Sequence, residues 1–171
     1  MNEEDRRAAL VRVARDKARI LYDGVLTPHR SCGVVLAETF GRATGAYQSL
    51  RRGGILGTGE CGAIVAGRLV LGELLGDPDP TGPVTPVLRA AMVDFEARWR
   101  TRVDRGRAPG ETIVCNTLTG QFAEFKSPER HRFCTDIATE VATTVAEVLL
   151  AQGYEPEVTP FPEGASPESG A

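Results

Sequence analysis

The chain has 171 residues, of which 42% are hydrophobic and 25% are charged, and its formal net charge is -3. A chain of this length buries about two thirds of its unfolded surface when it folds, so a single globular domain needs no disulfide for stability. The acidic balance gives no overall attraction for nucleic acid. The densest run of arginines, at residues 98–107, is interpreted as a solvated helix face and loop. We therefore expect no nucleic-acid partner.

The first residues, 1–7, are acidic and then basic, and they lack the apolar core of a signal peptide. No stretch reaches the roughly 18 uncharged residues that a membrane span needs. The sequence therefore predicts a cytoplasmic protein that does not associate with membranes. Thiols are kept reduced in that compartment, which leaves the cysteines free for chemistry.

Helical signals recur along the chain. They lie at residues 2–22, 28–41, 61–75, 86–103, 115–120 and 128–152, where apolar residues repeat with helical spacing. Asn2 is the predicted N-cap of the first helix, and Gly24, Gly41, Gly120 and Gly153 are predicted to end four of the segments. The sequence thus predicts an all-α fold, a compact bundle of about five helices.

The least polar stretch, residues 61–75, is predicted to be the central helix of the bundle. In this stretch Gly62 and Ala66, like Ala63 and Gly67, are four residues apart and share one helix face. Small residues at this spacing let a neighbouring helix or loop approach the backbone closely, which offsets the cost of a helical glycine, up to about 1 kcal/mol.

A glycine-rich segment, residues 51–59, leads into the central helix and ends at Gly59. It contains neither of the common phosphate-binding glycine patterns, so we interpret it as a backbone turn that presents Cys61. Further along, residues 77–86 hold four prolines and form an exposed connection. Residues 1–153 are predicted to form one helical domain, and residues 154–171, rich in Pro, Glu, Gly and Ser, a disordered tail.

Four single cysteines lie near the predicted starts of four helices. Each follows an N-cap candidate and falls within about two turns of it. A helix N-terminus favours negative charge, so a thiol placed there ionises more easily than a free one. Thiolates attack disulfides and bind metals, and we predict Cys61 to be the nucleophile, with a lowered pKa. The pairs of cap and cysteine are Thr27 with Cys32, Thr58 with Cys61, Thr112 with Cys115, and Ser127 with Cys134.

The order and setting of these cysteines resemble a known family. Cys32, then Gly59-Glu-Cys-Gly-Ala63 after a glycine-rich lead, then Cys115-Asn-x-Leu-x-Gly120, and finally Cys134 in a terminal helix resemble the C-GCAxxG-C-C family of redox-active proteins. The similarity covers about residues 8–150. It departs in one place: the family tends to have a glycine three residues after the motif alanine, whereas this chain has Ala66 there, followed by Gly67. The resemblance implies redox activity and supplies no substrate.

Both histidines stand three residues before a cysteine, His29 before Cys32 and His131 before Cys134. Residues three apart share a helix face, so an imidazole there could lower the thiol's pKa, accept its proton or add a metal ligand. The alternative is that both histidines lie in solvent or at a helix start without any part in the chemistry.

Three classes of function fit the sequence. The first is a thiol-based oxidoreductase, which cycles between dithiol and disulfide or transfers electrons with an unknown redox partner. The second is a metal protein in which the same four cysteines hold zinc or an iron-sulfur cluster. The third is a non-catalytic helical interaction domain, with the cysteines packed as small hydrophobes. The sequence also leaves open whether the chain forms a homo-oligomer.

The first two classes require the four cysteines to meet in the fold. A disulfide needs alpha carbons within about 7 Å, and a shared zinc needs sulfurs at about 2.3 Å from the ion. We therefore predict that Cys32, Cys61, Cys115 and Cys134 converge. The closest pair is expected to be Cys61 with Cys32 or Cys115, because the glycine-rich approach opens the start of the central helix.

Overall fold

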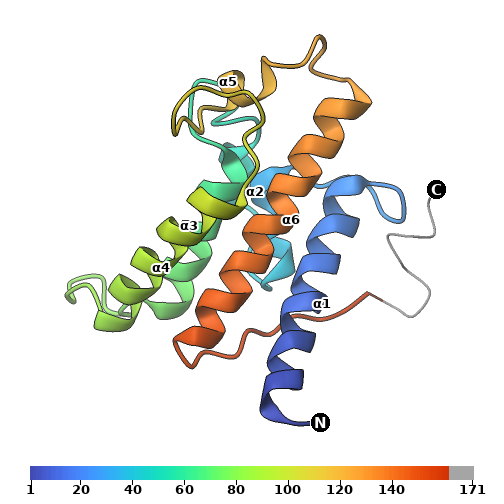
Figure 1. The fold of residues 1–171 in the computed structure, drawn as a ribbon. Coiled ribbons are helices and arrows are strands. Elements are labelled where there is room, and N and C mark those ends of the chain that lie inside the picture. The colour runs from blue at the N-terminus through green and yellow to red at the C-terminus, as the bar shows by residue number, and fades with distance from the viewer. Residues whose placement is uncertain (162–171) are drawn as a thin grey trace.

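The structure is a computed structural model that describes residues 1–161, and Figure 1 shows its helices side by side in a bundle. The all-α prediction is confirmed: the described part of the chain holds no strand, only an isolated bridge between Glu60 and Val114. The elements are α1 (Glu3–Asp23), α2 (Cys32–Thr39), the 3-10 helix η1 (Ala46–Leu50), α3 (Gly62–Leu75), α4 (Pro86–Arg102), α5 (Cys115–Thr119) and α6 (Pro128–Ala151).

Local capping explains where the long helices begin. The side chain of Asn2 accepts a hydrogen bond of 2.8 Å from the backbone N–H of Asp5, as predicted for the start of α1. Ser127 caps α6 in the same way through the N–H of Arg130, at 3.2 Å, with a proline at the first helical position. Gly24 ends α1 in the left-handed conformation, with φ of 78°, which glycine adopts without strain.

Helix α6 lies in the middle of the bundle and packs against α1, α2, α3 and α4 (Figure 1). The predicted small-residue face of α3 is buried, and a Cβ atom at Gly67 would lie 2.6 Å from the ring of Phe95 on α4. This distance is shorter than any ordinary packing contact, so glycine is needed there for α4 to approach α3. Helix α3 is thus a buried apolar helix packed against α2, α4 and α6, as its composition predicted.

The chain continues past α6 in contact with the bundle. Tyr154, Val158 and Phe161 pack against the hydrophobic core, and Glu155 pairs with Arg6 of α1. The first eight residues of the segment expected as a disordered tail therefore lie on the domain, because their apolar side chains have a surface to cover. The rest of that predicted tail, residues 162–171, lies outside the described residues.

None of the helices in the described part combines the length and the apolar character that a membrane span requires.

Candidate functional site

The four cysteines line one cavity of about 220 Å³. Cys32 and Cys115 are the first residues of α2 and α5, Cys61 is the N-cap of α3, and Cys134 lies in the second turn of α6. All four are free thiols. The predicted convergence is confirmed, since residues from four separate helices meet in a single space.

Three of the four predicted N-caps are wrong, although the cysteines do lie near helix starts. The residues that cap α2, α3 and α5 are Ser31, Cys61 itself and Val114. The threonines predicted as caps, Thr27, Thr58 and Thr112, lie outside these helices. The hydroxyl of Thr112 accepts a bond of 3.3 Å from the N–H of Val114, so it stabilises the turn that leads into α5.

The glycine-rich segment is hydrogen-bonded to the segment that enters α5, and this pairing brings Cys61 and Cys115 together. The N–H of Cys61 donates to the carbonyl of Ile113 at 2.7 Å, and the N–H of Cys115 donates to the carbonyl of Gly59 at 2.9 Å. A third bond of 2.8 Å runs from the N–H of Asn116 to the carbonyl of Gly57. Backbone carbonyls of the loop thus occupy the N–H groups at the start of α5.

Left-handed backbone conformations shape this loop. Gly53 and Gly57 have φ of 59° and 79°, and a Cβ at Gly53 would lie 2.4 Å from the Cβ of Cys115. Two residues with side chains, Arg52 and Ile55, also have positive φ, at 51° and 73°. Such conformations are costly outside glycine and persist where the surroundings hold them, often at functional sites.

Cys32 lies against the start of helix α3. A Cβ at Gly62 would be 2.8 Å from the sulfur of Cys32 and 2.2 Å from the carbonyl oxygen of Leu50. The thiol of Cys32 also contacts that same carbonyl, at 3.8 Å. Gly62, the residue after Cys61, therefore provides the space into which the sulfur of Cys32 fits.

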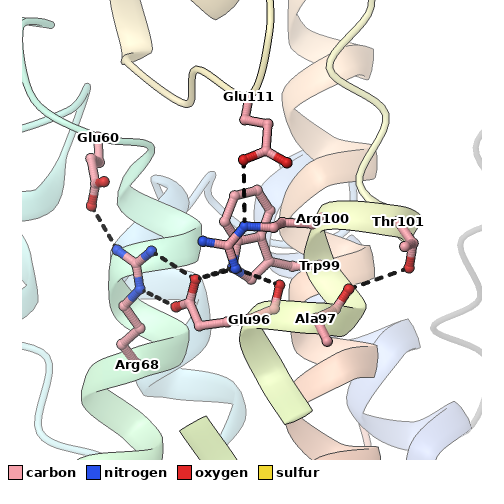
Figure 2. A network of polar contacts seen from close by, with 8 residues as sticks. All are labelled: Glu60, Arg68, Glu96, Ala97, Trp99, Arg100, Thr101 and Glu111. Carbon is pink, nitrogen blue, oxygen red and sulfur yellow. Dashed lines mark hydrogen bonds and ion pairs between the residues drawn. The ribbon is translucent and has the colours of Figure 1, made fainter. Parts of the chain in front are cut away.

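An ionic network ties the segments that enter α3 and α5 to α4 (Figure 2). Arg68 of α3 donates to Glu60 at 2.6 Å and to Glu96 of α4 at 2.6 Å. Glu96 also pairs with Arg100 at 2.9 Å, and Arg100 reaches Glu111 at 4.0 Å. Because Glu60 precedes Cys61 and Glu111 lies shortly before Cys115, the network holds both cysteine segments against the same helix.

This network predicts a pH dependence of stability. Burial alone would raise the pKa of Glu96, but hydrogen bonds from Arg68 and Trp99 outweigh it and hold that pKa below the ordinary value. A carboxyl with a lowered pKa stabilises the fold above its unfolded pKa, about 4.3, and this stability is lost as the pH falls through the folded pKa. We expect Glu96→Gln to cost about 1–3 kcal/mol at pH 7.

The measurement is urea unfolding of the wild type and of the Glu96→Gln variant between pH 7 and pH 3. The difference in the free energy of unfolding between the two should shrink as the pH falls from about 4.3 through the lower pKa of the folded carboxyl, where the wild-type side chain becomes protonated too. A difference that stays constant down to pH 3 would contradict a charged Glu96 at the centre of the network.

The predicted lowering of the Cys61 pKa is wrong. Burial raises the pKa of the Cys61 thiol well above its ordinary range, and the nearby Cys32 acts in the same direction. The N–H groups of Ile64 and Ala63 at the start of α3 do favour the thiolate, as the helix argument expected. The cost of removing a charge from water is larger than that contribution.

Cys32 and Cys115 show the same dominance of burial. Burial raises the pKa of Cys32, against the opposing effect of the Arg52 and Gly33 N–H groups. Burial also raises the pKa of Cys115 to about 11, while the charges of Arg52 and Arg130 favour its thiolate. Cys115 is only half-buried, so it is a more accessible thiol than Cys61.

The two histidines meet at the end of α1, with their rings 5.5 Å apart. His29 donates from Nδ1 to the carbonyl of Tyr22, and His131 donates from Nε2 to the carbonyl of Asp23, at 3.0 Å. The rings therefore satisfy carbonyl groups that the helix end leaves free. His29 lies before α2 and not on it, so the predicted helical spacing to Cys32 does not exist there. His29 does line the cavity.

Several residues of the cavity were not identified from the sequence. Tyr22 is buried beside the thiols, and burial together with Cys134 and Cys32 raises its pKa, which keeps its hydroxyl protonated as a donor. Arg52 and Arg130 also line the cavity, with Phe125 between them. The sequence does place Arg51 and Arg52 directly before Gly53-Gly54, but two adjacent arginines are too few to stand out as a basic run.

The metal alternative finds no support in the arrangement of side chains. Among residues 1–161, no group of three or more His, Cys, Asp or Glu side chains is placed so that it could hold a metal ion. The four thiols thus share a cavity without three of them forming the group of ligands that zinc or an iron-sulfur centre requires.

Comparisons with protein-family models, with curated proteins and with solved structures found no match for this chain.

Proposed function

We propose that the chain is a thiol-based redox protein whose four-cysteine cavity cycles between dithiol and disulfide. The observation that carries this proposal is that every cysteine of the chain, from four helices, lines one cavity. Cysteines that serve only as small hydrophobes have no reason to gather around a shared space. The resemblance to the C-GCAxxG-C-C family points to the same function, and a cytoplasmic location would keep the resting thiols reduced.

The raised pKa values suggest the direction of electron flow. A dithiol becomes a strong oxidant when its reduced form is stabilised as a thiolate. Here burial raises the pKa of Cys32, Cys61 and Cys115, so the reduced form gains no such stabilisation. We therefore assign the cavity the part of an electron donor, with the disulfide as its favoured product.

The exchange begins at Cys115, a half-buried thiol whose thiolate the charges of two arginines favour. Its thiolate attacks one sulfur of an acceptor disulfide, whose S–S bond breaks and whose other sulfur leaves as a thiolate that takes up a proton. A second cavity cysteine then attacks the Cys115 sulfur and releases the rest of the acceptor as a thiol. The protein loses two electrons and two protons, and the acceptor gains both. Cys61, predicted as the nucleophile, is better suited to this second, resolving step because it is buried.

Cys61→Ser separates this chemistry from folding. Serine is a preferred N-cap, and at residue 61 its hydroxyl would lie at the start of α3, where it can accept from the N–H of Ala63 or Ile64. We expect the variant to remain folded, with a melting temperature within about 4 °C of the wild type. It should form fewer intramolecular disulfides than the wild type when it is treated with a small disulfide, counted by mass spectrometry under non-reducing conditions.

Two outcomes would contradict the proposal. If the oxidised wild type contains no intramolecular disulfide, the cysteines do not act together. If Cys61→Ser melts far below the wild type while its disulfide count is unchanged, Cys61 serves packing alone. Metal analysis of protein purified without oxygen tests the alternative of a metal site. Zinc or iron bound in stoichiometric amounts would show that the cysteines hold a metal and would contradict the dithiol mechanism.

A further inference from the structure

Three arginines give the cysteine cavity a positive lining. Arg51, Arg52 and Arg130 line it, and no aspartate or glutamate does. In the part of the chain that the structure describes, none of these three arginines takes part in an ion pair, although the other elements are rich in such pairs. A chain with a net charge of -3 thus leaves three positive charges unbalanced at one cavity.

Two of the arginines are held close to each other by one aromatic ring. The guanidinium carbons of Arg52 and Arg130 lie 4.6 Å and 4.3 Å from the centre of the Phe125 ring. Arg130 is fixed further because its Nε donates to the carbonyl of Phe125. Each contact with the ring is favourable, but two like charges gathered on one side chain repel each other. An anion between them would remove that repulsion.

The backbone also indicates that the position of Arg52 matters. Its φ of 51° is in the left-handed region, where glycine would fit without strain and where the next two residues are glycines. An arginine kept in this conformation projects its side chain onto Phe125. Strain of this kind concentrates at ligand sites, where the surrounding structure holds it in place.

A neutral donor and the size of the space define the ligand further. Ser31 lines the cavity, and its hydroxyl oxygen is buried without a hydrogen-bond partner among the described residues. A buried hydroxyl of this kind needs a partner that the described residues do not supply. The cavity, at about 220 Å³, is smaller than the usual site of a drug-sized molecule, so the group inside it must be small.

We propose that Arg52 and Arg130 form a subsite for the anionic group of a small molecule, a carboxylate or another oxyanion, beside the cavity thiols. Arginine matches these groups because its fork donates two parallel hydrogen bonds to two oxygens. That the bound molecule is the electron acceptor rests on the function proposed above, whereas the binding itself does not. The subsite would hold an acidic disulfide with its sulfur near Cys115.

The binding is tested with sulfate and phosphate as probes, by titration calorimetry at constant ionic strength. The wild type should bind at least one of them saturably, and Arg52→Ala/Arg130→Ala should bind it at least about tenfold more weakly. Arg52→Lys keeps the charge without the fork and should lie between the two. Arg89→Ala, an exposed arginine of α4 outside the cavity, is the matched control and should bind as the wild type does.

The second arm compares two small disulfides, the dicarboxylate 3,3'-dithiodipropionate and the neutral bis(2-hydroxyethyl) disulfide. Both compounds should oxidise the wild type faster than Arg52→Ala/Arg130→Ala, because the two arginine charges favour the Cys115 thiolate. The ratio of the wild-type rate to the variant rate should be clearly larger for the anionic compound than for the neutral one, once folding is verified by circular dichroism. An equal ratio for the two compounds, or equal binding of sulfate and phosphate by the two proteins, would overturn the subsite.

The two proposals fail separately. If neither disulfide oxidises the protein, but sulfate binds through Arg52 and Arg130, the redox proposal is wrong and the subsite stands. If both disulfides oxidise the protein and the loss of the arginines slows them by the same factor, the redox proposal stands and the subsite is wrong.

Discussion

Replacing Gly62 with alanine should destabilise the protein by about 3 kcal/mol, a large fraction of the stability of a single domain. The new methyl group would lie 2.2 Å from the carbonyl oxygen of Leu50 and 2.8 Å from the sulfur of Cys32. The first of these is a backbone atom that cannot rotate away. For a domain of this size the change corresponds to a fall in melting temperature of about 6–12 °C, measured by circular dichroism.

Gly72→Ala is the matched control, in the same helix α3. A Cβ at Gly72 would meet nothing within 4 Å, so alanine there should stabilise the helix by about 0.5–1 kcal/mol. The sulfur of Cys32 must move in Gly62→Ala, and its alkylation should become faster than in the wild type. If the two variants melt alike, the close approach of α2 to the start of α3 is not a feature of the protein.

Alkylation of Cys115 in the folded protein should be about 10²-fold slower at pH 8 than that of a free cysteine. A thiol with a pKa of about 8.5 is roughly one quarter ionised at that pH. Burial raises the pKa of Cys115 to about 11, which leaves roughly one molecule in a thousand ionised. Since only the thiolate reacts, the rate should follow this fraction.

The pH profile gives the sign of the effect. The rate at Cys115 should rise about tenfold for each pH unit from 7 to 10, because deprotonation is far from complete there. Arg52→Ala should slow the reaction further, since the charge of Arg52 favours the thiolate. Mass spectrometry of tryptic peptides after iodoacetamide treatment gives the rate for each cysteine. A rate that levels off near pH 8 would contradict the raised pKa, and Cys61 reacting first would restore it as the nucleophile.

The sequence predicted the helices well where local chemistry decides the structure. Asn2 and Ser127 cap their helices through their own side chains, and Gly24 ends α1 in a conformation that suits glycine. The small residues of α3 were also interpreted correctly, because their spacing on one face implies close packing whatever the partner is. The sequence could predict the cavity only indirectly, because a chemical function shared by four cysteines requires them to meet in the fold.

The sequence failed where tertiary contacts override local signals. Thr27 precedes a proline and looks like an N-cap, but the chain runs in a loop there and His29 and Arg30 bond back to the end of α1. The pKa of Cys61 depends on how completely the fold removes it from water, and no spacing of residues reveals that. The arginine pair at the cavity was missed for the same reason, since Arg130 is far from Arg52 in the chain.

The single tryptophan gives the protein an internal optical probe at an informative place. Trp99 is 2% exposed and donates from its indole N–H to Glu96 at 2.9 Å, inside the network that holds the segments before Cys61 and Cys115. Its fluorescence therefore reports the support of the cysteine cavity without any label. When unfolding is followed by this emission and by thiol release, coincident transitions would mean that cavity and bundle unfold as one cooperative unit.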